Sequence, residues 1–263
     1  MTGTSRNTYV DLKVQPLSAR SMILSVLLGT HPPRLPLLDL LALGDLFGFR
    51  AGTVRTALSR MTNNEELTLE DGWYALGERM QARQQTQDSG RATEQVPWSG
   101  EWILATVLAD RRSSSARRAF RASMLTARMG ELRPDTWLRP ANIPPPSPAR
   151  DLVITTGPTK LSKPLKLVSR LWPLAEYDQH TTSLLRSLET TIPMLESGDH
   201  EAIPYTFRIS AEVVRFLRVE PKLPHELHPG SSSVELLRRS YDEYEVVFAR
   251  LLRDFLMSQR SAT

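Results

Sequence analysis

Residues 50–61 have the side-chain pattern of a helix whose polar face binds a partner rather than only solvent. They read Arg-Ala-Gly-Thr-Val-Arg-Thr-Ala-Leu-Ser-Arg-Met. At about 100° per residue, Val54, Leu58 and Met61 fall on one side of a helix. The opposite side carries Gly52, Thr56 and Ser59, and Arg55 and Arg60 flank it. Small residues let a backbone approach base edges, and arginines bind guanine edges or phosphates. The pattern favours a DNA-reading helix over the simpler alternative, a solvated face.

Composition limits the other chemistries. The chain has 263 residues, a formal charge of +4 and no cysteine, which excludes thiolate catalysis, thiolate metal sites and disulfides. The longest apolar run, residues 22–28, is far below the ~20 residues of a membrane span. The histidines are not spaced as metal ligands, and no nucleophile elbow, phosphate loop or paired-carboxylate motif occurs. We expect a soluble cytoplasmic protein that is not an enzyme and has no metal or cofactor.

The elements around residues 50–61 predict a winged helix-turn-helix over residues 17–77. A helix begins after the N-cap Ser18 and stops at Gly29, and a second helix covers residues 37–47. After the third helix, strands at 67–69 and 73–76 flank Asp71-Gly72, a strong hairpin signal. In winged helix-turn-helix proteins the third helix enters the major groove. Four acids (Glu65, Glu66, Glu70 and Asp71) indicate a wing that stands off DNA or faces protein.

The rest of the chain predicts an α+β protein with two further domains. Residues 1–16 form a loose arm, and residues 78–94 form a linker helix and hinge. A strand at 101–108, a helix that ends at Gly130, and strands at 135–140 and 151–157 suggest a ferredoxin-like domain over residues 95–159, although its last helix is not evident. Residues 160–263 are expected to form a mainly helical domain. Its last helix has an apolar stripe from Val234 to Phe255, which either completes a core or joins two subunits.

Several segments resemble the PaaX-like transcriptional regulators. LSARSMILSVLLG and VRTALSRM are similar to that family's N-terminal domain, and WSGEWILATVLAD and GELRPDTWLRP to its central sheet domain. SRLWPLAEYDQHTTSLL and YTFRISAEVVRFLRVEPKLPHELHPG resemble its C-terminal segments. The resemblance covers nearly the whole chain beyond residue 16.

This resemblance implies a homodimeric repressor of a catabolic operon that binds a palindromic double-stranded DNA operator. In the founding members phenylacetyl-coenzyme A releases the operator. By the same resemblance, residues 160–263 are expected to be the effector and dimerisation domain. The residues expected to contact DNA are Arg20, Arg50, Thr53, Arg55, Thr56, Ser59 and Arg60. The chain departs from the family at Ala211 and Glu212, where His is usual, at Glu220, where Asp is usual, and by lacking a tryptophan after residue 227. The effector is therefore an aromatic acid or its acyl-coenzyme A, not necessarily the family's own.

The sequence gives only weak grounds for choosing the residues that bind the effector. They are Arg117, Arg118, Trp172, Tyr177, Tyr205, Arg208 and Arg215. Arg117 and Arg118 belong to a basic cluster over residues 111–121, for which a solvated face, a second DNA contact and a phosphate cradle are all open readings. The aromatic residues are more often core, and Arg208 and Arg215 could equally form structural ion pairs. Two other functions remain alternatives. One is effector-independent DNA binding, and the other is a ferredoxin-like nuclease using Asp110 and Mg²⁺.

Overall fold

The computed structural model describes residues 17–30, 32–78, 80–81, 95–107, 112–144, 152–229 and 231–261, with only the backbone at 152–160. It confirms an α+β protein, and it divides into two compact units. Unit 1 comprises residues 1–90, 184–213 and 239–263, and unit 2 comprises residues 91–183 and 214–238. The division into three domains stays a prediction. None of the described helices is long and apolar enough to cross a membrane.

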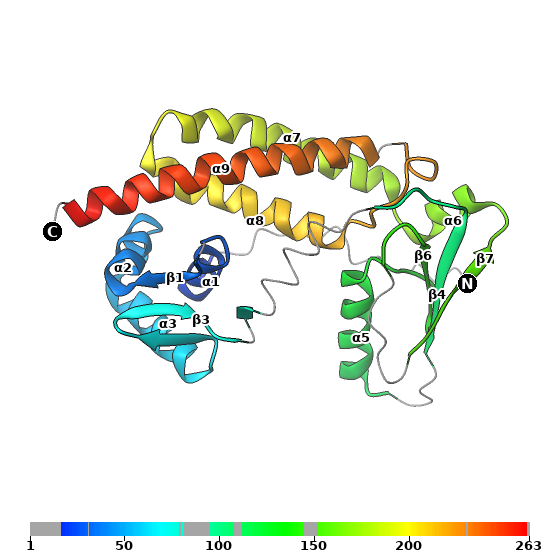
Figure 1. Cartoon of the computed structure of the whole chain (residues 1–263), viewed down its shortest axis with the longest axis horizontal. Coiled ribbons are helices and arrows are strands. Elements are labelled where there is room, and N and C mark those ends of the chain that lie inside the picture. The colour runs from blue at the N-terminus through cyan, green and yellow to red at the C-terminus, as the bar shows by residue number, and fades with distance from the viewer. Residues whose placement is uncertain are drawn as a thin grey trace. The chain divides into compact units, whose positions relative to one another are not determined.

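Unit 1 begins with three helices and a small antiparallel sheet (Figure 1). The elements are α1 (Ala19–Leu28), β1 (Arg34–Pro36), α2 (Leu37–Leu46), α3 (Ala51–Asn63), β2 (Leu67–Glu70) and β3 (Trp73–Leu76). The strand order is β1-β3-β2. The helices and the hairpin follow the predicted order, but β1 was not predicted. It lies in a proline-rich connection and becomes a strand only by pairing with β3, where prolines are tolerated because it is an edge strand.

Local signals explain where these elements begin and turn. The Ser18 hydroxyl accepts a 3.1 Å hydrogen bond from the Ser21 amide, and Gly29 caps the end of α1, as predicted. Asp71 and Gly72 both have positive φ, at 49° and 81°, which gives the two-residue turn that joins β2 to β3.

Close packing in the core of this region fixes the position of α3 relative to α1 and α2. Val54, Leu58 and Met61 are at most 1 % exposed and pack with the apolar residues of α1 and α2. A Cβ atom added at Gly44 of α2 would lie 2.4 Å from Cγ2 of Val54. Gly44 is therefore the position that lets α2 and α3 approach closely, and a larger residue there would push α3 away.

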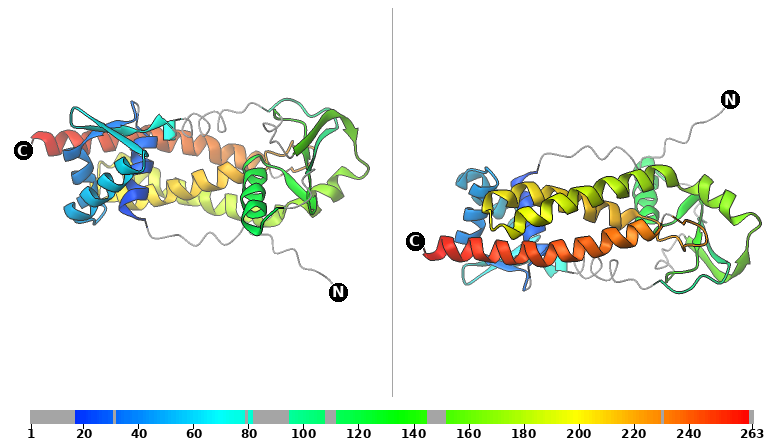
Figure 2. Two further views of the ribbon diagram at one scale, coloured as in Figure 1. Left: turned by 90° about the horizontal axis from the view of Figure 1, so that it is seen from below. Right: turned by 90° about the horizontal axis from the view of Figure 1, so that it is seen from above.

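Unit 1 also contains parts of three long helices, α7 (Leu174–Glu196), α8 (Ile203–Val219) and α9 (Ser231–Ser261), with a short 3-10 helix over His200–Ala202. Figure 2 shows α8 and α9 side by side. The Phe47 ring, just after α2, lies 5.2 Å from the Phe207 ring of α8, which lies 6.0 Å from Phe248 of α9. Arg260 of α9 binds both carboxylate oxygens of the buried Asp39 of α2. The N-terminal region is thus joined to α8 and α9 by aromatic packing and an ion pair.

The apolar stripe of α9 is used inside the chain. Six of its positions are buried, namely Val234, Leu237, Tyr241, Tyr244, Leu251 and Phe255. Of the two roles predicted for the stripe, completion of a core is the one observed at these six positions. Burial also raises the pKa of the Tyr244 hydroxyl.

Unit 2 contains a four-stranded antiparallel sheet in the order β5-β6-β4-β7. Its elements are β4 (Glu101–Val107), α5 (Ser114–Thr126), β5 (Gly130–Arg133), β6 (Thr136–Pro140), β7 (Leu152–Lys160) and α6 (Pro164–Leu171). Within the described residues no helix lies between β6 and β7. This leaves the ferredoxin-like description a prediction whose second helix is not observed. Strand β5 and helix α6 were not predicted.

The prediction that Gly130 ends α5 is wrong. The helix ends at Thr126 with Ala127 as its C-cap, and Gly130 is the first residue of β5. A Cβ atom at Gly130 would lie 2.9 Å from both Cβ of Leu171 and Cζ2 of Trp172. Glycine occurs here because β5 packs closely on the end of α6.

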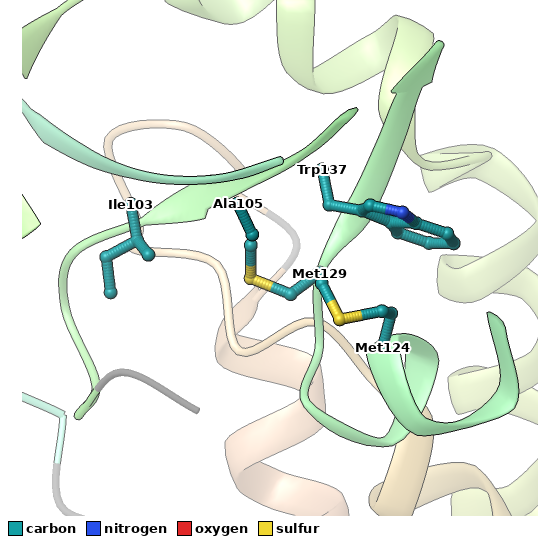
Figure 3. Close-up of a cluster of buried hydrophobic side chains, with 5 residues drawn as sticks. All are labelled: Ile103, Ala105, Met124, Met129 and Trp137. Carbon is teal, nitrogen blue, oxygen red and sulfur yellow. The ribbon is translucent and has the colours of Figure 1, made fainter. Parts of the chain in front are cut away.

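Helix α5 is held to the sheet by a small apolar core. Figure 3 shows Met124 and Met129 gathered with Ile103, Ala105 and Trp137 of the sheet. Phe120 packs against this cluster with its ring 6.4 Å from that of Trp137. Met124 is the only residue of α5 that is fully buried, and Phe120, Arg121 and Leu125 are half-buried. The remaining face of the helix is available to solvent or to a partner.

Candidate DNA-binding surface

Helix α3 has the two faces that its sequence predicts. Val54, Leu58 and Met61 are buried. The opposite face is exposed and consists of Gly52, Thr53, Arg55, Thr56, Ser59, Arg60 and Asn63. The helix contains no acidic residue, and Arg50 is its exposed N-cap. The exposed surface is therefore cationic at its edges and built from small polar side chains at its centre.

The arginines of this face are available for a partner. Among the residues that the structure describes, the side chains of Arg50, Arg55 and Arg60 have no hydrogen-bonding or ionic partner. The Thr56 hydroxyl donates a 2.8 Å hydrogen bond to the carbonyl oxygen of Gly52, one turn earlier in the same helix. Free guanidinium groups beside small side chains can bind base edges or phosphates without first breaking an internal ion pair.

Arg20 differs from the arginines of α3. Its guanidinium forms a bidentate pair with Glu66, with Nε 2.9 Å from Oε2 and Nη2 2.5 Å from Oε1. This hydrogen bonding raises the pKa of Arg20. The pair joins α1 to the turn between α3 and β2 and neutralises the buried carboxylate of Glu66. One of the four acids assigned to the wing thus has a structural partner, which the sequence did not reveal because the two residues are 46 positions apart.

The tip of the wing keeps its acidic character. Glu65, Glu70 and Asp71 are exposed. Behind the tip, Trp73 is 38 % exposed, and the Arg34 guanidinium lies 5.3 Å from the centre of its ring. The exposed carboxylates at the tip of the wing would repel the phosphates of DNA.

The predicted effector residues occupy different environments. In unit 2, Trp172 and Tyr177 are buried, Arg215 is half-buried, and Arg117 and Arg118 are exposed. In unit 1, Tyr205 and Arg208 are exposed on α8. Trp172 packs on Gly130, and the Tyr177 ring lies 5.8 Å from that of Phe216. Within either unit, the structure does not bring these residues together into one site.

A group of interior cations in unit 2 was not predicted. Arg139, Lys222 and Glu220 are buried, and Arg238 forms an ion pair with Glu220. Burial lowers the pKa of Arg139 to about 10, with a further contribution from Arg128. Burial also lowers the pKa of Lys222 to about 8, assisted by Arg238 and Arg128. These residues come from β6, α9 and the 220–230 loop, so only the tertiary fold places them together.

Metal chemistry finds no support in the described part of the chain. There, no three His, Asp or Glu side chains are grouped so that they could hold a metal ion. His228 lies 2.9 Å from Asp178 as an isolated pair. Asp110, the residue on which the nuclease alternative rests, lies outside the described residues.

Comparison with known proteins gives three findings. A sequence model of the family described as "PaaX-like protein" matches residues 18–80, and no curated protein matches the chain. Among solved structures, the chain is similar to the uncharacterized protein Rv0674 from Mycobacterium tuberculosis, with 29 % identity and a TM-score of 0.71 over 90 % of this chain and 98 % of that one. The family match spans α1 to β3, the region that contains the exposed face of α3. Residues 18–80 are therefore similar to the PaaX-like family, and this likeness covers the region from α1 to β3.

Proposed function

We propose that the protein is a transcriptional repressor that reads double-stranded DNA through α3 of a winged helix-turn-helix. The observation that carries this proposal is the face of α3, where Arg55 and Arg60 are exposed and have no partner among the described residues. It lies inside the segment that matches the PaaX-like family. Helix α3 contains no acidic residue, and its exposed arginines form no ion pair with the described residues. Packing of the protein core therefore does not explain why these arginines are present.

Within this proposal the residues have distinct roles. Arg55 and Arg60 contact guanine edges or the adjacent phosphates, and Arg50 contacts a phosphate at the start of the helix. Thr53, Thr56 and Ser59 are small enough to let the backbone of α3 approach the bases. Arg20 orients α1 against the α3–β2 turn through Glu66, so its contribution to DNA binding is indirect.

The finer parts of the mechanism follow from the family. We infer a cytoplasmic homodimer on a palindromic operator that regulates a catabolic operon and is released by an aromatic acid or its acyl-coenzyme A. Unit 2 contains cations and aromatic side chains of the kind that such an anion needs, among them Arg215 of α8 and the ring pair of Tyr177 and Phe216. Release requires only that the effector bind the DNA-free state more tightly by a few kcal/mol.

Selection of duplexes from a random pool, followed by gel shift, tests the DNA assignment. We expect a defined sequence to be enriched and Arg55→Ala or Arg60→Ala to lose it without a change in melting temperature. Equal enrichment by wild type and the double variant would refute the role of α3. The same selected duplex, incubated with Mg²⁺ and run on a denaturing gel, distinguishes binding from cleavage.

A second assay tests the effector. Free aromatic acids and their coenzyme A thioesters are screened for release of the selected duplex and for a rise in melting temperature. Arg215→Ala should abolish the response and keep DNA binding. If no compound in the panel acts on either readout, the protein is an effector-independent DNA-binding protein.

A further inference from the structure

Helix α5 presents a second cationic surface that resembles that of α3 in composition. Its exposed residues are Ser114, Ser115, Ala116, Arg117, Arg118, Ala119, Ala122, Ser123 and Thr126. The chain has no acidic residue between Asp110 and Glu131. A solvated helix is usually stabilised by Glu–Lys or Asp–Arg pairs at i, i+4, and α5 has none. Exposure to solvent therefore does not explain why the exposed face of α5 carries arginines and no acidic residue.

The arginines around α5 divide into two groups. Arg112 pairs with Asp135 and Arg121 pairs with Glu131, both across to the β5–β6 hairpin. These two also lie over aromatic rings, Arg112 4.7 Å from the centre of Phe120 and Arg121 5.8 Å from that of Trp137. They fasten the helix to the sheet, and their charges are neutralised.

Arg117 and Arg118 form the second group. Both are exposed, and neither has a hydrogen-bonding or ionic partner in the part of the chain that the structure describes. No acidic residue occupies the first turn of the helix, where acids are usually favoured by the free amide groups. The small residues around the two arginines leave their guanidinium groups and the nearby serine hydroxyls accessible to a polyanion.

We infer that α5 is a second contact with DNA, in which Arg117 and Arg118 bind backbone phosphates without reading sequence. This inference rests on the proposed function and adds to it a sequence-independent surface in unit 2. A phosphate needs only charge and donors, both of which α5 offers. Reading bases needs a helix fixed in place, and α5 buries only Met124 fully, whereas α3 buries three residues.

The test compares salt dependence in four forms of the full chain. Affinity for the selected duplex and for a mixed-sequence duplex is measured from 50 to 300 mM KCl for wild type, Arg117→Ala/Arg118→Ala, Arg117→Lys/Arg118→Lys and the control Lys166→Ala/Arg170→Ala. The control removes two exposed cations from α6, elsewhere in unit 2. We expect the alanine pair to flatten the log–log slope by about 1.8, twice the ~0.9 of one phosphate contact. The ratio of specific to mixed-sequence affinity should stay unchanged, and the lysine pair should keep the wild-type slope.

Each other outcome overturns the inference in a recognisable way. A wild-type slope in the alanine pair removes α5 from the DNA interface, and equal flattening in the α6 control reduces the effect to net charge. If the alanine pair keeps the slope but loses the melting-temperature response to coenzyme A, the two arginines hold effector phosphates instead. Failure of the proposed function is distinct, because wild type would then bind neither duplex. The substituted side chains are exposed, so equal melting temperatures verify the fold of every variant.

Discussion

Helices α3 and α5 are each 13 residues long, lack acids, and alternate arginines with Ser, Thr, Ala and Gly. They differ in how each helix is packed against the rest of the protein. Helix α3 is anchored by three residues that are at most 1 % exposed, and α2 approaches it closely at Gly44. Helix α5 is anchored by Met124 and by two ion pairs with the neighbouring hairpin. On the two proposals made above, α3 reads bases and α5 holds phosphates, and the two helices differ in the firmness of their attachment rather than in their composition.

The sharpest way to break this comparison is to remove the arginines of α3. Arg55→Ala with Arg60→Ala should lower affinity for the selected duplex by ~1–3 kcal/mol per lost base contact, because a bidentate guanine contact has that value. Affinity for a mixed-sequence duplex should fall much less, since the phosphate contacts of the rest of the protein remain. Fluorescence anisotropy on both duplexes measures the ratio. An equal loss on both would make α3 a phosphate-binding helix like α5.

Two glycine variants separate the effect of the packing of α3 on DNA binding from the effect of its exposed face. Gly44→Ala should reduce the free energy of unfolding by ~1–3 kcal/mol, because the new methyl group would overlap Val54. Gly52→Ala meets no atom within 4 Å and should stabilise the helix by up to ~1 kcal/mol. Both should weaken DNA binding, the first through misplacement of α3 and the second through the added bulk facing the bases. Urea denaturation with gel shift checks this, and undiminished affinity in Gly52→Ala would exclude close approach at that residue.

Conservative replacement should affect the two helices differently. Arg55→Lys with Arg60→Lys should lose most of the sequence preference, because lysine cannot make the two parallel hydrogen bonds of a guanidinium. The equivalent change in α5 should leave affinity near wild type. Competition between selected and mixed-sequence duplexes measures both. If the lysine variants of α3 keep their sequence preference, its arginines bind phosphates only.

The wing provides a smaller effect. Glu70→Lys with Asp71→Lys should steepen the salt dependence of binding by up to ~0.9 for each new phosphate contact. Asp71 has a positive φ, so Glu70→Lys alone is the control that leaves the turn unchanged. A slope equal to wild type in both variants would place the wing away from DNA.

The smallest expected effect contrasts the exposed arginines of α5 with the interior cations of the same unit. Lys222 has a pKa of about 8 in the folded protein against its usual 10.5. Between these values the unfolded chain holds a proton that the folded chain has released, so stability from this group rises with pH over that window and is lost as pH falls through 8. Relative to Lys222→Met, wild type should gain melting temperature from pH 7.5 to 9.5. Parallel curves for the two proteins would contradict this assignment.

Local rules predicted the elements that carry local signals. The cap at Ser18, the turn at Asp71-Gly72 and the apolar side of α3 each depend on residues within one or two turns of each other. Strand β1 and the role of Gly130 were missed because both depend on distant partners, β3 in one case and the end of α6 in the other. The ion pair of Arg20 with Glu66 and the interior cations of unit 2 have the same origin. The exposed face of α3 was predictable, but the neutralisation of half the arginines around α5 was not.

The ion pair between Arg260 and Asp39 has a practical consequence for fragments of this protein. The two residues are 221 positions apart, and the Asp39 side chain is only 2 % exposed. A fragment that stops before Arg260 would leave a carboxylate buried without its cation, which is costly in a protein interior. The same fragment boundary, moved further back, would also uncover Phe47 by removing Phe207 and Phe248. The region proposed to bind DNA is continuous in sequence, but we expect its melting temperature to depend on whether the last turn of α9 is present.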